Sequence, residues 1–356
     1  MNQKTDRTIK AVLFKSKERF DAFQTKLSEY GIDYIILDFE EHEWLTFDFS
    51  HINFIIYYPS FRFSSNHPLA LHDVCDNFMF LHERYPHIKI WPDPKLFKYF
   101  NDKYRQYLFL TANNYPVPET IPLFSEKSVE LAEKRLGYPM VIKNRYGAGG
   151  GAVFRVFNKK ELLKYYNLSE LNLFNLDAAK YFAGMLSKRL FYYSLIKAKK
   201  ARYPFFSPPI LAQKFIKIDR DLKTVVGNYK VVESHWRLQA NEEMWKMNID
   251  AGGTGVWSKV PKEAIDLSVR LAKELEASWL NIDLLMSNGY FLISEFSPAW
   301  HHYTYKEKPS FVYKEDYNID VPLEVSLDLE RIIVESLIEA VKKEKKSGKE
   351  SEKRER

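Results

Sequence analysis

Residues 140–156, MVIKNRYGAGGGAVFRV, place a lysine directly before a glycine-rich loop. The loop carries four glycines, at Gly147, Gly149, Gly150 and Gly151. Glycine allows positive φ and a close backbone approach, so successive N–H groups can converge on an anion such as phosphate. Lys143 ends the preceding strand-like run, and Lys103 lies at the start of a predicted helix. Two ammonium groups beside such a loop favour a polyphosphate site.

The loop differs from the common nucleotide-binding motifs. It lacks the G-x-x-x-x-G-K-[ST] pattern, and it joins two predicted strands instead of opening a helix. Taken alone, it is better explained as a flexible hairpin, and each lysine as a solvated surface residue. The combination of the loop with Lys103 and Lys143 is what indicates phosphate binding.

Two carboxylates flank a predicted hairpin near the C-terminal end. Asp283 lies five positions before Asn288, and Glu295 lies six positions after Gly289. Asn-Gly is a strong hairpin signal, and a bulge of one residue would bring both carboxylates to one face of the strands. Because an unpaired carboxylate in an apolar strand is costly, we expect them to bind a hard cation such as Mg2+. The alternative is a salt bridge or an outward-facing pair.

Composition limits the classes of function. The 356 residues are enough for two or three domains of ~100 to 200 residues each. The net charge is +6, but the last fifteen residues hold eight Lys/Arg and four Glu, which leaves +2 elsewhere and argues against nucleic-acid binding. The single cysteine, Cys75, excludes an internal disulfide and a thiolate metal site. With no secretory signal and no long apolar run, we expect a cytoplasmic protein without a membrane span.

The elements that must position these residues alternate in type. Over the first hundred residues, strands and helices alternate, which predicts βαβ units around a mostly parallel sheet. Residues 160–206 read as helical, aromatic and basic. Residues 208–218 and 223–240 read as strands of one antiparallel sheet. Amphipathic helices are expected over 261–277 and over 322–346.

Taken in order, several segments resemble the ATP-grasp superfamily, and most of all its RimK-like carboxylate-amine ligases. These segments are Lys103, VIKNRYGAGGGAV, LAQKFI, DLKTVVGNYKVV, MNIDAGG, NIDLL and ISEFSP. The resemblance covers about residues 91–303. It implies an α/β (α+β) chain with the ATP-grasp fold and an N-terminal pre-ATP-grasp βαβ domain.

The resemblance also implies domain limits. They are a pre-ATP-grasp domain at 1–98, an ATP-grasp domain at 99–325 with a lid at about 115–210 and a C-terminal subdomain at about 211–325, and a helix and charged tail at 326–356.

The resemblance assigns roles residue by residue. The glycine loop would close over ATP phosphates that Lys103 and Lys143 contact. A hinge would bind adenine through its backbone, at Gln213, Lys214, Phe215 and Ile216. Asp221 would lie near the ribose or the acceptor. The γ-phosphate and an acyl phosphate would be held by Arg237, Lys246 and Asn248. Asp283, Glu295 and Ser297 would bind Mg2+, with Mn2+ as an alternative ion.

Two positions depart from the family pattern. Ser297 stands where an asparagine is usual, so a hydroxyl replaces an amide oxygen, and Lys214 stands where acidic residues are common. His301 and His302 follow the second carboxylate strand and are expected to be solvated. Trp236 and Trp245, which flank the predicted γ-phosphate region, are expected in the core.

The resemblance implies an ATP- and Mg2+-dependent ligase that joins a carboxylate to an amine, each a small molecule or a peptide, through an acyl phosphate. An ATP-binding regulatory or scaffold protein without ligase activity is the alternative. A nucleic-acid binder using residues 197–206 is a weaker one, and dimers are common among relatives.

Overall fold

The computed structural model describes most of the chain, in several ranges. They are residues 9–16, 19–59, 71–146, 153–170, 172, 174–195, 210–218, 220–239, 245–247, 253–298, 310–313, 320–323 and 328–354. Among the helices in these ranges, none combines the length and apolar character of a membrane span.

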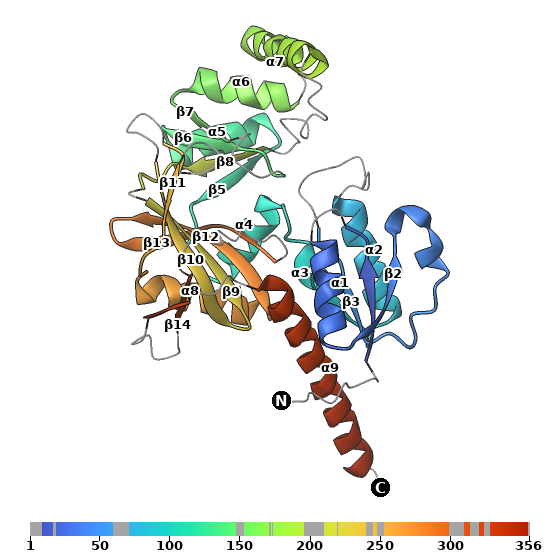
Figure 1. Ribbon diagram of the computed structural model, residues 1–356. Coiled ribbons are helices and arrows are strands. Elements are labelled where there is room, and N and C mark those ends of the chain that lie inside the picture. Colours follow the sequence, from blue (N-terminus) through green and yellow to red (C-terminus); the bar gives the residue numbers. More distant parts are fainter. Residues whose placement is uncertain are drawn as a thin grey trace.

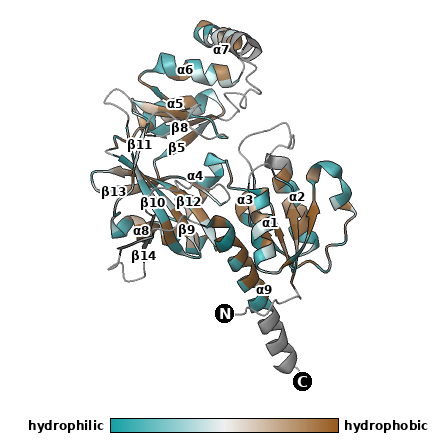
Figure 2. Cartoon of the chain, in the orientation of Figure 1, coloured by the Kyte–Doolittle hydropathy of each residue, from teal (hydrophilic) through white to brown (hydrophobic). Residues whose placement is uncertain are grey.

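The N-terminal part is built on a four-stranded parallel sheet of order β2-β1-β3-β4. Its strands and helices are β1 Lys10–Phe14, α1 Phe20–Glu29, β2 Asp33–Leu37, β3 Phe54–Ile56, α2 Leu71–Arg84, β4 Lys89–Trp91 and α3 Pro94–Phe97. Its strands are largely apolar, as Figure 2 shows, and Figure 1 shows the helices against the sheet. The predicted βαβ arrangement is confirmed.

A second sheet, of order β5-β8-β6-β7, is antiparallel. This part contains α4 Lys103–Ala112, β5 Thr120–Leu123, α5 Glu126–Leu136, β6 Met140–Lys143, β7 Val153–Val156, α6 Lys159–Ser169, α7 Leu176–Leu195 and β8 Ile210–Lys214. Alternate residues of its strands, Met140 and Ile142 among them, form a buried cluster with α5 and α6. The opposite face therefore carries Lys143 and Gln213. We call this sheet the lid sheet.

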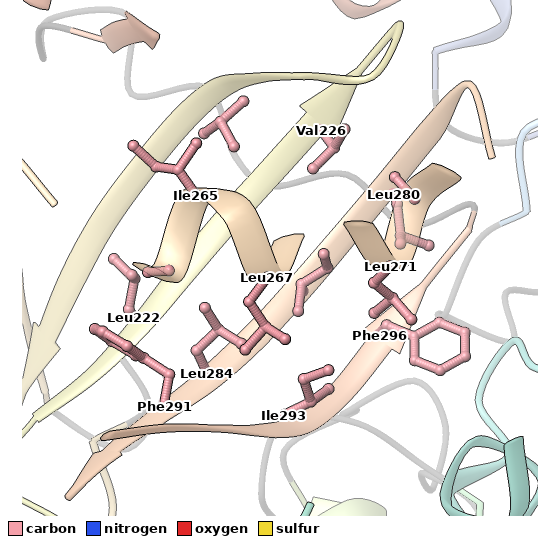
Figure 3. Close-up of a cluster of buried hydrophobic side chains, with 14 of the residues drawn as sticks. Leu222, Val226, Ile265, Leu267, Leu271, Leu280, Leu284, Phe291, Ile293 and Phe296 are labelled. Atoms are coloured by element: carbon pink, nitrogen blue, oxygen red, sulfur yellow. The ribbon is translucent and has the colours of Figure 1, made fainter. Parts of the chain in front are cut away.

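The third sheet is antiparallel, with the order β11-β10-β9-β12-β13. Its elements are β9 Arg220–Gly227, β10 Lys230–Leu238, β11 Thr254–Val256, α8 Lys262–Glu274, β12 Trp279–Ser287 and β13 Tyr290–Ser297. One face packs on α8 through the apolar cluster drawn in Figure 3. We call this sheet the main sheet. The expectation that 208–218 would pair with 223–240 is wrong, because β8 pairs with β5 and β6 of the lid sheet.

The predicted hairpin between the carboxylate strands is confirmed. Asn288 and Gly289 have φ values of 51° and 80°, as a tight hairpin turn requires. The β12–β13 ladder pairs Asp283 with Glu295 and then shifts register beside Asp283, which leaves Ser294 as the extra residue of a bulge. The two carboxylates therefore lie on one face, as expected.

The C-terminal helix begins later than the sequence predicts. Residues 320–323 form β15 Asp320–Leu323, paired with β14 Ser310–Tyr313, and the helix is α9 Leu329–Arg354. The start of α9 packs against α1, with Lys26 Nζ 2.9 Å from an Asp328 carboxylate oxygen. This helix joins the N-terminal part to the main sheet (Figure 1).

Candidate functional site

A cavity lies between the lid sheet and the main sheet. Three of the predicted site residues line it, namely Lys103, Lys143 and Gln213. Apolar walls come from side chains on α4, β8 and the segment before β5: Leu110, Leu211 and Val117. Ser294, the bulge residue of β13, lines the same cavity and is not among the residues predicted from the sequence. The cavity is small, about 10 Å³, but its lining combines apolar side chains with two ammonium groups, the types of group that contact a base and its phosphates.

The two lysines are positioned by an ion pair that joins their elements. Asp102 caps α4, accepting from the N–H groups of Tyr104 and Arg105 at 3.1 Å each. The same carboxylate accepts from Arg145 Nε at 2.9 Å and from Arg145 Nη2 at 2.7 Å. In addition, the Lys103 N–H donates to the Arg145 carbonyl oxygen at 3.1 Å. The start of α4 is thus fixed to the end of β6, which carries Lys143.

Charges of both signs surround Lys143. Burial lowers the pKa of its ammonium group to about 8, Lys103 lowers that pKa as well, and the carboxylates of Glu295 and Asp283 raise it. Lys103 Nζ lies 3.9 Å from a Glu295 carboxylate oxygen. The structure therefore brings the two lysines of the predicted phosphate site to the two carboxylates of the predicted metal site.

A row of polar residues crosses four strands of the main sheet, on the face opposite α8. The register aligns His235 of β10 with Lys223 of β9, Lys223 with Asp283 of β12, and Asp283 with Glu295 of β13. Partners in register present their side chains to the same face. The neighbouring row contains Asn281, aligned with Ser297.

Asp283 takes part in a buried ionic network. Its carboxylate lies 3.0 Å from Lys223 Nζ and 3.0 Å from an Arg237 guanidinium nitrogen. Arg237 also donates to both oxygens of Asp221, at 2.6 and 3.0 Å. Burial alone would raise the pKa of Asp283, but Arg237 and Lys223 outweigh it and hold that pKa well below its usual range. The salt-bridge alternative for Asp283 is therefore present, and its carboxylate is ionised, as a metal ligand must be.

The oxygen atoms of the predicted metal site suit Mg2+. Asp283, Glu295 and Ser297 offer only oxygen atoms, and the ladder places all three on one face. Among the described residues, no group of three or more His, Cys, Asp and Glu side chains could hold a metal. Two carboxylates suit an Mg2+ ion that is shared with substrate phosphates, since such ions usually take only one or two protein carboxylates. The residues fit that mode of binding.

The predicted hinge, residues 213–216, already makes contacts within the protein. Gln213 donates through its side-chain amide to the Thr120 hydroxyl at 2.9 Å, and the Lys214 N–H donates to the Glu119 carbonyl oxygen at 2.8 Å. Lys214 N–H is therefore already occupied, which differs from the expectation that it binds adenine. The half-buried Phe215 and Ile216 follow it in the chain. The Arg155 guanidinium lies 5.3 Å from the Phe215 ring and 5.6 Å from the Trp245 ring, so it connects β7 to the hinge.

Other predicted residues lie elsewhere. Asp221 is buried against Arg237 on the main sheet, and Lys246 Nζ lies 5.8 Å from the Phe154 ring of β7. Trp236 is buried in the core, as expected, whereas Trp245 is half-buried beside Phe215. The four loop glycines, Asn248, and the histidines His301 and His302 lie outside the described residues.

Sequence reasoning missed several polar residues of this face. They are Lys223, Glu233, His235 and Asn281, together with Arg145 beside the cavity. A polar residue at every second position of β10 was the available signal, since Glu233, His235 and Arg237 alternate with residues of the other face.

The chain was compared with known proteins. No family model matches it. It is 26% identical over 202 residues to human N-acetylaspartylglutamate synthase A, covering 54% of this chain and 42% of that protein. It is 27% identical over 191 residues to the alpha-aminoadipate–LysW ligase LysX of Sulfolobus acidocaldarius, covering 53% and 57%. The chain spans about half the length of these curated relatives.

A solved structure matches over nearly the whole length. It is the ATP-grasp ligase PsnB complexed with minimal precursor, Mg and ADP, at a TM-score of 0.54 and 12% identity, covering 95% of this chain and 99% of that one. Identity at this level is evidence for the fold alone. The predicted fold class is confirmed, and so is the resemblance on which it was based.

Proposed function

We propose that this chain, whose fold is the ATP-grasp fold, is an ATP- and Mg2+-dependent ligase that joins a carboxylate to an amine. One observation carries the proposal. The half-buried Lys143, at the end of the lid-sheet strand β6, is influenced by the charge of Lys103 beside it and by the carboxylates of Glu295 and Asp283 on the main sheet, and Lys103 Nζ lies 3.9 Å from a Glu295 carboxylate oxygen. A triphosphate between the two sheets would meet the lysines on one side and an ion held by the carboxylates on the other.

The chemistry has two steps in this proposal. The substrate carboxylate attacks the γ-phosphorus of ATP, which forms an acyl phosphate and releases ADP. The amine then attacks the acyl carbon, which forms the amide and releases phosphate and a proton. Mg2+ would neutralise charge on the transferring phosphoryl group when bound between Asp283, Glu295 and the phosphates.

The chain's own residues would supply positioning and charge. Lys103 and Lys143 bind the phosphates, and Arg237 lies one row further along the main sheet, where it can stabilise an anionic intermediate. The glycine loop between β6 and β7 is proposed to cover the phosphates and exclude water from the acyl phosphate. Gln213, Phe215 and Ile216 are proposed to border the base, Asp221 to hold Arg237, and Lys246 and Asn248 to approach the γ-phosphate.

The domain limits remain part of the proposal. They are 1–98, 99–325 and 326–356, with β8 assigned to the lid because of its pairing with β5 and β6. The curated relatives act on amino-acid substrates by their names, and a carboxylate and an amine of that kind are our proposed substrates. A cytoplasmic location, a homodimer and use of Mn2+ also remain predictions.

The test is ADP release from ATP and Mg2+ over a panel of amino acids and small dicarboxylic acids. We expect turnover that depends on both an acid and an amine, and its loss in Glu295→Gln. The Glu295 side chain is 41% exposed, so this substitution should leave the fold intact. ATP binding without substrate-stimulated ADP release would favour the scaffold alternative.

A further inference from the structure

Asn281 presents a buried side-chain amide beside the carboxylate pair. Its side chain is 2% exposed, and within the described residues neither its oxygen nor its nitrogen makes a hydrogen bond. Buried amides are nearly always bonded, because the lost hydration is not otherwise replaced. An unbonded amide at this depth therefore indicates a group that binds there in the functional state.

The position of Asn281 identifies the kind of group. It lies two residues before Asp283 on β12, so both side chains point to the same face of the main sheet. It is also the register partner of Ser297 on β13, just as Asp283 is the partner of Glu295. Two neighbouring cross-strand pairs thus present two carboxylates, one hydroxyl and one amide on the same face of the main sheet.

We propose that the Asn281 Oδ1 atom is a ligand of the Mg2+ ion held by Asp283 and Glu295, or of a water bound to that ion. Amide oxygens are common ligands of hard cations, and an uncharged oxygen adds a ligand without adding negative charge to the site. The Ser297 hydroxyl, directly across the ladder, then orients the amide. This inference rests on the proposed function, because that function supplies the ion.

The test measures ion binding, independently of turnover. Mn2+ is titrated into the full chain with saturating ADP, and bound ion is followed by electron paramagnetic resonance. We expect Asn281→Ala to raise the dissociation constant by about tenfold or more. Ser234→Ala is the matched control. Ser234 lies on the opposite face of the same sheet, and its fully buried hydroxyl makes no hydrogen bond to any residue that the structure describes. This control variant should bind Mn2+ like the original chain.

A reciprocal exchange tests the geometry. The double variant N281S/S297N moves the amide across the ladder and keeps the same set of atoms, so it should recover most of the lost affinity. A double variant that binds no better than Asn281→Ala, or an Asn281→Ala variant with unchanged affinity, would overturn the inference. The Glu295→Gln variant distinguishes a wrong role for Asn281 from a wrong metal site. If Glu295→Gln loses Mn2+ while Asn281→Ala does not, only the role of Asn281 fails. If both bind normally, the metal site fails too.

The unfolding temperature of a second variant gives an independent test, which can be used even if Asn281→Ala folds poorly. Asn281→Leu replaces a buried amide by an apolar group of similar size, so it should raise the unfolding temperature without metal and reduce the further increase that Mg2+ produces in the presence of ADP. A structural role for the amide predicts the opposite pair of results, a lower unfolding temperature with the Mg2+-dependent increase retained. That result would overturn the inference.

Discussion

Asp102 and Arg145 are 43 positions apart in the chain and form a two-pronged ion pair with oxygen–nitrogen distances of 2.9 and 2.7 Å. The pair connects the first turn of α4 to the end of β6. Lys103 follows Asp102 directly and Lys143 lies two positions before Arg145, so the distance between the two ammonium groups depends on a contact that involves neither of these lysine side chains.

Arg145→Met should therefore weaken both the fold and nucleotide binding. Removing the guanidinium leaves the Asp102 side chain, which is 2% exposed, without its main counter-charge, and we expect a loss of about 3 kcal/mol in the free energy of unfolding. ADP affinity should fall as well, which calorimetry measures, while urea unfolding measures the change in stability.

Arg105→Met is the control. Arg105 also contacts Asp102, at 3.4 Å, but its side chain is 49% exposed, so its loss should cost less than about 1 kcal/mol. Equal effects of the two variants would contradict the role given to the pair.

Lys143 should make nucleotide binding sensitive to mildly alkaline pH. Its folded-state pKa of about 8 means that the ammonium group of the free protein loses its proton as pH rises through 8. ADP affinity should then fall between pH 7 and pH 9.5, measured by calorimetry without metal. Lys143→Arg keeps its charge over this range, so its affinity should stay flat. If the ADP affinity of the original chain does not change between pH 7 and pH 9.5, the pKa of Lys143 is not lowered in the folded protein.

The lowered pKa of Lys143 also predicts that the free energy of unfolding increases with pH, whereas ADP affinity decreases. Between pH 8 and the unfolded-state pKa of 10.5, the unfolded chain binds more protons at Lys143 than the folded chain does. The contribution of Lys143 to stability therefore increases as pH rises through this window. Comparing urea midpoints of the original chain and Lys143→Arg at pH 8 and pH 10 isolates this contribution.

The sequence and the structure agree where the signal is local. The Asn288-Gly289 turn fixed the β12–β13 pairing, and Lys103 and Lys143 lie at the ends of elements that periodicity indicated. The Asp102–Arg145 pair and the Lys223–Asp283 contact could not be found in this way. The first depends on how the start of α4 lies against the segment that follows β6. The second depends on the register between β9 and β12, where a shift of one residue would move the side chain to the other face. The pairing of β8 with β5 was missed for the same reason.

His235 should make the fold less stable in mild acid. Burial lowers its pKa to about 3, with Lys223 and Arg237 acting in the same direction, whereas the unfolded chain has a pKa of 6.5 at this group. Between these values the unfolded chain binds the extra proton, so this contribution to stability is present above pH 6.5 and lost as pH falls. From pH 7 to pH 5 the loss is about 2 kcal/mol.

The measurement compares urea unfolding of the original chain and His235→Gln at the two pH values. The variant should lose about 2 kcal/mol less than the original chain on acidification. His87→Gln, at an exposed histidine, should behave like the original chain. If His235→Gln has the same pH dependence as the original chain, His235 is protonated or accessible in the folded state.

We predict that Lys223 competes with a bound cation for Asp283. Its ammonium group lies 3.0 Å from the Asp283 oxygen, and the Lys223 side chain is 7% exposed, so its charge is poorly screened. Lys223→Met should lower the free energy of unfolding without metal by about 2 to 3 kcal/mol, because Asp283 then loses one of the two ion-pair partners that it has among the described residues. The same change should strengthen Mg2+ binding in the presence of ADP, since a positive charge beside the ligand oxygen is removed.

Lys230→Met, at an exposed lysine on the same sheet, should alter neither the free energy of unfolding nor Mg2+ binding. Calorimetric Mg2+ titration decides between two roles for Lys223. Tighter Mg2+ binding in Lys223→Met would show that Lys223 neutralises Asp283 in the absence of the ion and competes with the ion when it binds. Weaker Mg2+ binding would show that Lys223 orients Asp283 for the ion.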